Sequence, residues 1–220
     1  MPDTRLTWFN VKEHLRKFIW VYIVVIVVSL VVGDLLWTTT APRTPEDQRV
    51  LIYLANPWSN ASQLAPFAEE ALNEVKQADD TLEEVAFETL MYSDQDYTGT
   101  MLLMTRLAVG EGDAFFAGQA AMDALMKSGV CMPLEEYYEN GWLRDSGLEP
   151  YYGEVIDEET GESASHLAGF RLDSLTALQD LEAFDNQGAY LVVMSNGTNI
   201  DTTMKVLETI VRDLKEASAK

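Results

Sequence analysis

Hydrophobic residues follow three kinds of pattern along this chain. A continuous apolar run covers Phe18–Gly33, and beyond position 49 short apolar runs alternate with stretches of helical period. Runs of four to eight apolar residues are typical of buried strands, whereas apolar residues at i, i+3, i+4 and i+7 indicate amphipathic helices. The pattern therefore predicts an apolar N-terminal segment followed by a folded domain of strands and helices.

Three strand–helix units follow one another in the first half of that domain. The strand VLIYLA (50–55) precedes a helical stripe, a second strand within 82–92 precedes the turn SDQDYTGT and a helix over 101–109, and the strand DAFFA (113–117) precedes a helix over 119–128. Gly110 and Gly129 are expected to end the last two helices. The first helical stripe comprises Leu64, Phe67, Ala68, Ala71, Leu72 and Val75. Three such units predict an α/β domain with one mainly parallel sheet.

The second half of the domain is less regular. A short helix or turn is expected over 132–143, and a β-hairpin over 151–173 with its tip at DEETGE (157–162). A further buried strand, AYLVVMSN, covers 189–196. From Ile200 the apolar stripe that continues to Leu214 predicts a closing helix.

The N-terminal apolar segment is expected to be a membrane anchor. Residues 18–37 number about 20, which is the length needed to cross a bilayer core. Basic residues precede the segment, at Arg5, Lys12, Arg16 and Lys17, and the next one after it is Arg43. This asymmetry predicts that residues 1–17 are cytoplasmic and that the remainder is extracytoplasmic. Residues 38–48 are predicted to be an extended linker to a domain over 49–220.

A cleaved signal peptide is the competing interpretation of the same segment. Thr39, Thr40 and Ala41 faintly resemble a cleavage site. Pro42 would then follow the cut, and the apolar run is longer than that of an ordinary signal peptide. An uncleaved signal anchor in the cell membrane, with a single span, is therefore the favoured interpretation.

Charge divides the chain in the same place. Residues 1–43 hold five basic and three acidic residues, whereas residues 44–220 hold ten basic and thirty-three acidic ones. Such an acidic domain is repelled by phosphate backbones and by anionic lipid headgroups. Nucleic acid is therefore excluded as an expected partner.

The residues that could carry chemistry form no catalytic pattern. A single cysteine, Cys131, cannot form an internal disulfide and is expected to be buried, and the two histidines, His14 and His166, cannot supply a multi-histidine metal site. The glycines at 110 and 112 precede a strand, so they suit a helix end better than a phosphate loop. We predict a protein that is not an enzyme and that has no catalytic residues, metal or cofactor.

Polar and aromatic residues follow the predicted strands at their carboxyl ends, where open parallel sheets bind ligands. Trp58 and Tyr97 could stack on a sugar or a peptide, and the polar side chains could orient it. The predicted ligand-binding residues are Asn56, Trp58, Ser93, Asp94, Tyr97, Gln119 and Asn196.

Two regions carry a resemblance to a known family, over most of 50–140 and 185–215. The matching positions in the first are Ala108, Gly110, Asp113, Gly129, Pro133, Leu134, Glu135, Glu136 and Tyr137; the second is the strand and helix from Ala189 to Leu214. The chain resembles the extracellular solute-binding proteins of bacterial ABC importers.

That resemblance implies one lobe of a periplasmic-binding-protein fold. The family has two lobes joined by a hinge, and too few residues lie between Tyr137 and Ala189 for a second lobe. It implies a membrane-anchored extracytoplasmic binding or interaction module whose partner is an envelope protein or a small solute such as a sugar or peptide. The alternative is the substrate receptor of an ABC-type importer, with another chain supplying the missing lobe.

Overall fold

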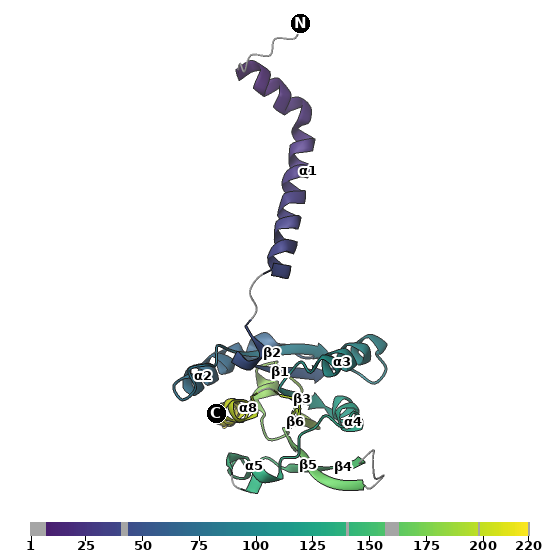
Figure 1. Cartoon of the computed structure of the whole chain (residues 1–220), viewed down its shortest axis with the longest axis vertical. Coiled ribbons are helices and arrows are strands. Elements are labelled where there is room, and N and C mark those ends of the chain that lie inside the picture. Colours follow the sequence, from purple (N-terminus) through teal and green to yellow (C-terminus); the bar gives the residue numbers. More distant parts are fainter. Residues whose placement is uncertain (1–7, 41–43, 140, 157–162, 198, 220) are drawn as a thin grey trace. The chain divides into compact units, whose positions relative to one another are not determined.

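The computed structural model describes residues 8–40, 44–139, 141–156, 163–197 and 199–219 (Figure 1). The chain divides into two compact units, Met1–Arg43 and Thr44–Lys220, which are described separately. Their boundary falls inside the predicted linker. The extended backbone expected from residue 38 was nevertheless wrong for its first residues, because helix α1 (Trp8–Thr40) continues through Thr40. The sequence has no proline between Pro2 and Pro42 that could end the helix earlier.

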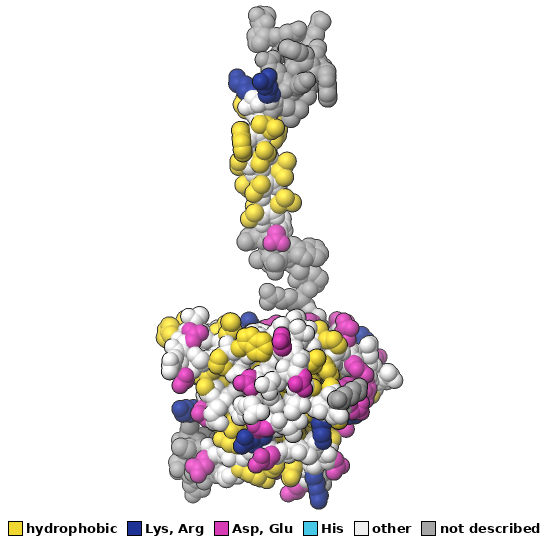
Figure 2. Space-filling view, turned by 180° about the vertical axis from the view of Figure 1, so that it is seen from behind, with side chains coloured by type: hydrophobic (Ala, Val, Ile, Leu, Met, Phe, Trp, Pro, Cys, Tyr) yellow, Lys and Arg dark blue, Asp and Glu magenta, His cyan; other side chains and the backbone are white. Residues whose placement is uncertain are grey.

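The first unit contains a helix that is long and apolar enough to cross a membrane, over Arg16–Asp34. Figure 2 shows hydrophobic side chains covering this part of α1 between basic side chains at one end and an acidic one at the other. A signal sequence has the same length and composition, so these two properties alone do not separate an anchor from a signal.

The second unit is built on one six-stranded sheet, with strand order β2-β1-β3-β6-β5-β4. The strands are β1 (Arg49–Asn56), β2 (Glu84–Met91), β3 (Ala114–Gly118), β4 (Pro150–Ile156), β5 (Ser163–Arg171) and β6 (Ala189–Val193). The α/β class with a single sheet is confirmed.

The strand directions are mixed rather than mainly parallel. β1 pairs in parallel with β2 and with β3, whereas the pairings β3–β6, β6–β5 and β5–β4 are antiparallel. The parallel half corresponds to the strand–helix units that the sequence predicts. In the second half β4 and β5 form the predicted hairpin, which is necessarily antiparallel, and its tip at 157–162 lies outside the described residues.

Helices cover both faces of the sheet (Figure 1). α2 (Ala65–Lys76) and α8 (Ile200–Ser218) pack in one core with Ile52, Leu54 and Phe116. α3 (Tyr97–Val109) and α4 (Gln119–Lys127) contribute to the other core, with Tyr53 and Phe115. The remaining helical segments are short: η1 (Glu46–Gln48), η2 (Ala61–Leu64), α5 (Glu135–Glu139), α6 (Trp142–Asp145) and α7 (Ala177–Asp180).

Local signals set most helix ends where the sequence predicts them. Gly110 and Gly129 follow α3 and α4 with φ of 72° and 68°, which glycine adopts without a steric cost. The start of α3 differs from the prediction. It begins at Tyr97, inside the predicted turn, because the Asp96 carboxylate accepts a hydrogen bond from the Thr98 amide at 2.9 Å and caps the helix there.

Candidate functional site

The carboxyl ends of β1, β2 and β3 lie at one edge of the sheet, and there β1 and β3 approach closely. A Cβ atom placed on Gly118 would lie 2.7 Å from Asn56 Oδ1, so the Asn56 side chain packs directly against the Gly118 backbone. The Asn56 amide also donates a hydrogen bond to the Asp185 carbonyl at 3.2 Å. This hydrogen bond ties Asn56 to the segment between α7 and β6.

Gln119, the first residue of α4, is the centre of a polar cluster at this edge. The Tyr190 hydroxyl donates a hydrogen bond to Gln119 Oε1 at 2.7 Å, and Gln119 Nε2 donates one to Asp123 Oδ1 at 2.9 Å. The rings of Tyr151 and Tyr190 meet edge to face, with their centroids 4.7 Å apart. We call Gln119, Asp123, Tyr151 and Tyr190 the Gln119 cluster.

Burial keeps the Tyr190 hydroxyl protonated. The side chain is 5% exposed, and burial raises the pKa of its phenol. The Asp123 carboxylate oxygen accepts a hydrogen bond from the Gln119 amide nitrogen, which leaves Gln119 Oε1 as the acceptor for the Tyr190 hydroxyl. Gln119 itself remains exposed, and a ligand at the edge can reach it.

A groove of about 540 Å³ adjoins this cluster between α3 and α4. Asp123 belongs to both the cluster and the groove. The walls of the groove combine apolar surface with two carboxylates and one ammonium group, as small-molecule sites commonly do. The residues that line the groove are Tyr92, Asp94, Met104, Ala120, Asp123, Ala124, Lys127 and Ser128.

Three of the seven predicted site residues, Asn56, Asp94 and Gln119, come together at this edge. Ser93 is half-buried and its carbonyl accepts a hydrogen bond from the Asp96 amide at 3.1 Å, which is a turn contact. Trp58 and Tyr97 are exposed and do not line the groove.

Asn196 is placed elsewhere, and its expected position was wrong. It follows β6, which runs antiparallel to β3, so the carboxyl end of β6 lies at the opposite edge of the sheet. There the Asn196 amide nitrogen lies 3.1 Å from where a Cβ on Gly110 would be. Instead of Asn196, the amino-terminal end of β6 lies beside Gln119, and it contributes Tyr190.

Sequence reasoning missed Asp123, Tyr151 and Tyr190. Asp123 had a usable signal, because residues four apart on a helix face the same side and Gln119 begins the predicted helix. The two tyrosines had none, because their position depends on the direction of β6 and on the β4–β5 hairpin. Tyr190 and Gln119 are 71 residues apart in the chain.

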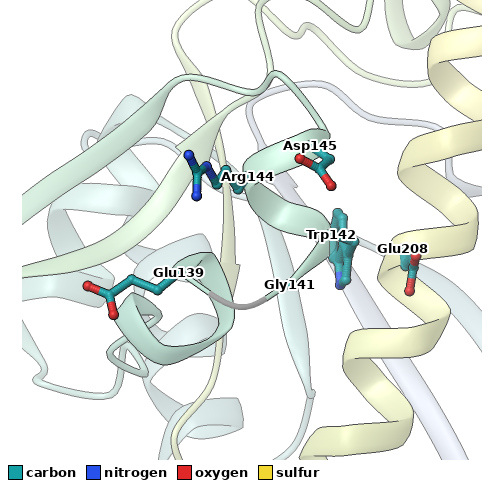
Figure 3. A pocket seen from close by; sticks show the side chains of 6 residues that line it. All are labelled: Glu139, Gly141, Trp142, Arg144, Asp145 and Glu208. Atoms are coloured by element: carbon teal, nitrogen blue, oxygen red, sulfur yellow. The ribbon is translucent and has the colours of Figure 1, made fainter.

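A second hollow, of about 640 Å³, lies between α6 and α8 and has no counterpart among the predicted residues (Figure 3). Trp142, Asp145 and Glu208 gather on one side of it, while the side chains of Glu139 and Arg144 extend away from them. The Trp142 indole nitrogen is buried and has no hydrogen-bond partner among the described residues. The walls of this hollow are mostly polar and acidic, in keeping with the acidic composition of the whole domain.

Other reactive side chains are held in structural positions. Cys131 is buried as predicted, and burial raises the pKa of its thiol to about 12, so it is not a thiolate at neutral pH. His166 lies on the predicted hairpin, and its Nδ1 is 3.5 Å from Glu135 Oε1. The part of the chain that the structure describes holds no group of three or more metal-ligating side chains; Asp157, Glu159 and Glu162 of the hairpin tip lie outside that part.

Comparison with known proteins gives only distant similarity. No protein-family model matches the sequence, and no curated protein matches it. The N-glycan transport solute-binding protein NgtS from Streptococcus pneumoniae is similar over 42% of this chain and 18% of its own, at 17% identity and a TM-score of 0.29. The substrate-binding domain of a putative molybdenum ABC transporter from Clostridium difficile is similar over 78% of this chain and 95% of its own, at 11% identity and a TM-score of 0.36.

A third solved structure gives the same result. The binding protein AttC from Agrobacterium tumefaciens C58, in an open unliganded conformation, is similar over 78% of this chain and 82% of its own, at 10% identity and a TM-score of 0.38. Likeness at this level carries no conclusion about function. What the fold and the edge define is a mixed α/β domain with a polar, partly aromatic groove at the ends of its parallel strands.

Proposed function

We propose that this chain is a membrane-anchored extracytoplasmic binding module that takes a short peptide or a sugar at the carboxyl edge of its sheet. The observation that carries the proposal is the connection between the Gln119 cluster and the α3–α4 groove through Asp123. The cluster supplies fixed donors and acceptors, and the groove supplies a concave surface beside them.

The chemistry of the groove suits a polar, uncharged or zwitterionic ligand. Asp94 and Asp123 offer carboxylate acceptors, and Lys127 offers an ammonium donor at the end of α4. Met104 and the alanines of α4 give apolar contact between them. Sugars and peptides combine hydroxyl or amide groups with apolar faces, and such a lining can bind both parts.

The anchoring part of the proposal is supported by α1. The described side chains between His14 and Leu36 are exposed, and they are apolar over a membrane-spanning length. The positive residues that precede the segment favour a cytoplasmic N-terminus. The thirty-three acidic residues beyond position 43 then belong to a domain outside the cell membrane.

The test is a binding screen with matched variants of the full-length protein. Sugars and short peptides are titrated onto the protein in nanodiscs, and Gln119→Ala is compared with Asn196→Ala. Both residues are exposed at strand ends, but Asn196 lies at the opposite edge. Gln119→Ala should weaken binding about tenfold or more, which is the effect of losing one or two hydrogen bonds to a buried ligand, while Asn196→Ala should bind normally.

Two outcomes would contradict the proposal. Equal weakening by both variants would move the site away from the Gln119 cluster. The absence of any sugar or peptide binding at millimolar concentration would remove the ligand class.

Binding of a free solute at micromolar strength or tighter would favour the importer receptor over a docking module.

A further inference from the structure

Asn196 combines two properties that no other asparagine described in this domain has. Its exposed side chain, in the turn between β6 and α8, forms no hydrogen bond within the described ranges, and the next residue is a glycine. The sequence has a second Asn-Gly pair at 140–141, where position 140 lies outside those ranges. Asn73 lies inside helix α2. The side chains of the remaining asparagines of the domain are hydrogen-bonded: Asn56, Asn60, Asn186 and Asn199.

The backbone nitrogen that follows Asn196 is weakly held. The Gly197 amide donates to the Met194 carbonyl at 3.5 Å, which is longer than the usual upper limit of about 3.2 Å. Glycine has no side chain to shield this nitrogen, and it leaves the backbone free to rotate. The Gly197 nitrogen can therefore turn toward the side-chain carbonyl carbon of Asn196, which no hydrogen bond to a described residue holds away from it.

We propose that Asn196 is a site of spontaneous deamidation, in which water is the co-reactant. The Gly197 backbone nitrogen gives its proton to hydroxide and attacks Asn196 Cγ. A C–N bond forms, the bond from Cγ to Nδ2 breaks, and the leaving nitrogen takes a proton from water and departs as ammonia. Water then adds to one of the two carbonyl carbons of the resulting cyclic imide and breaks that carbon's bond to nitrogen. The products are aspartate and isoaspartate at position 196, and no atom is oxidised or reduced.

The new carboxylate lies among other charges of the domain. Asn196 Nδ2 is 3.1 Å from where a Cβ on Gly110 would be, and Gly110 lines a small hollow together with Arg49, Glu111 and Asp113. Arg49 is already paired with Glu111, so the added charge is repelled by the Asp113 carboxylate. In isoaspartate the backbone also gains a methylene group between β6 and α8. Deamidation therefore changes both the charge and the chain path at this turn.

This modification goes beyond the proposed function, because Asn196 lies at the sheet edge opposite the Gln119 cluster. It needs no sugar or peptide. A failure of the binding screen leaves the deamidation untouched, and an Asn196 that does not react leaves the binding screen untouched.

The experiment follows Asn196 in the full-length protein, held in nanodiscs in neutral buffer. Samples taken at intervals are digested with trypsin, and fragmentation in the mass spectrometer assigns each replaced amide group to its residue. Asn186, which is completely buried, and Asn199, which caps α8, lie on the same tryptic peptide and serve as internal controls. The synthetic peptide VVMSNGTNI (192–200) gives the rate without tertiary structure.

The matched variant is Gly197→Ala. A Cβ at this position would have Asp113 Oδ1 as its nearest neighbour, at 3.4 Å, which is an ordinary van der Waals contact. The alanine side chain hinders the ring closure while the fold is kept, and circular dichroism confirms the fold. If the variant does not fold, Asn196→Gln replaces it, because its longer side chain would have to close a larger ring.

Asn196 of the folded protein should react within about threefold of the rate in the peptide, and Gly197→Ala should slow the reaction about tenfold or more. The rate should rise with pH, because the attacking nitrogen must first lose its proton. Asn186 and Asn199 should stay unmodified over the same period. A folded-state rate more than about tenfold below that of the peptide would overturn the proposal. An unchanged rate in Gly197→Ala, or equal reaction at Asn186, would do the same.

Discussion

Phe115 and Phe116 are neighbours in β3, yet their side chains lie in two different cores. Both are completely buried. The Phe115 ring lies 5.3 Å from the Tyr53 ring on the α3 and α4 side, and the Phe116 ring lies 6.4 Å from the Phe184 ring on the α2 and α8 side, measured between centroids. β3 is therefore a central strand that is covered on both faces, as the run DAFFA predicts.

Phe115→Ala and Phe116→Ala should each lower the free energy of unfolding by about 3 to 5 kcal/mol, because each leaves a cavity in a filled core. Chemical denaturation of the two variants measures this. Tyr152→Ala is the control, since Tyr152 is 56% exposed, and it should cost less than about 0.5 kcal/mol. A small effect for one phenylalanine would mean that its face of the sheet is open.

Asp113 should make stability depend on pH. Its Oδ2 accepts a hydrogen bond from the Leu51 amide at 2.8 Å, and burial raises the pKa of its carboxyl. The folded state therefore holds the proton more tightly than the unfolded state. This contribution to stability is present at low pH and is lost as pH rises through the folded pKa.

Asp113→Asn should remove that loss while keeping an oxygen acceptor for Leu51. Relative to the unchanged protein, its stability should rise as pH increases from about 4, the ordinary pKa of an aspartic acid, through the raised pKa of the folded state, measured by denaturation at each pH. Asp113→Ala should instead destabilise at every pH by about 1 to 3 kcal/mol, because the Leu51 amide loses its partner. A stability difference between Asp113→Asn and the unchanged protein that is constant with pH would contradict the assignment.

The ion pair between α2 and α8 should contribute little. Arg212 donates two hydrogen bonds to the Glu74 carboxylate, at 3.0 and 2.6 Å, and this lowers the pKa of Glu74. Both side chains are nearly half exposed, so solvent screens the pair. Glu74→Gln should cost less than about 1 kcal/mol near neutral pH, and nothing once acid has protonated Glu74. Thermal melting at two pH values checks both statements.

Membrane topology can be tested with single engineered cysteines. In intact cells an impermeant maleimide should label Glu46→Cys and spare Thr7→Cys if residues 1–17 are cytoplasmic. The mass of the mature protein distinguishes an uncleaved anchor from a cleaved signal peptide, because a chain that begins near Pro42 would be the product of a signal peptidase. Labelling at position 7 alone would reverse the orientation.

Much of the candidate site could not be predicted for one physical reason. Asn56, Asp94 and Gln119 lie at the predicted edge because they follow strands that pair in parallel, and the sequence pattern predicts those strands. The position of Asn196 was predicted wrongly because the apolar run AYLVV is the same whether its strand is parallel or antiparallel to its neighbour. Only the pairing of β6 with β3 settles this, and with it the position of Tyr190.

The sequence by itself determined the features that depend on near neighbours. Apolar periodicity determined which residues of β1, β3, α2 and α8 are buried, and Gly110 and Gly129 determined where two helices end. Only the tertiary structure decided the direction of β6, the groove between α3 and α4 and the contact of Gln119 with Tyr190. These depend on contacts between distant segments, which form when packing and hydrogen bonding are satisfied over the whole sheet, and no local pattern encodes them.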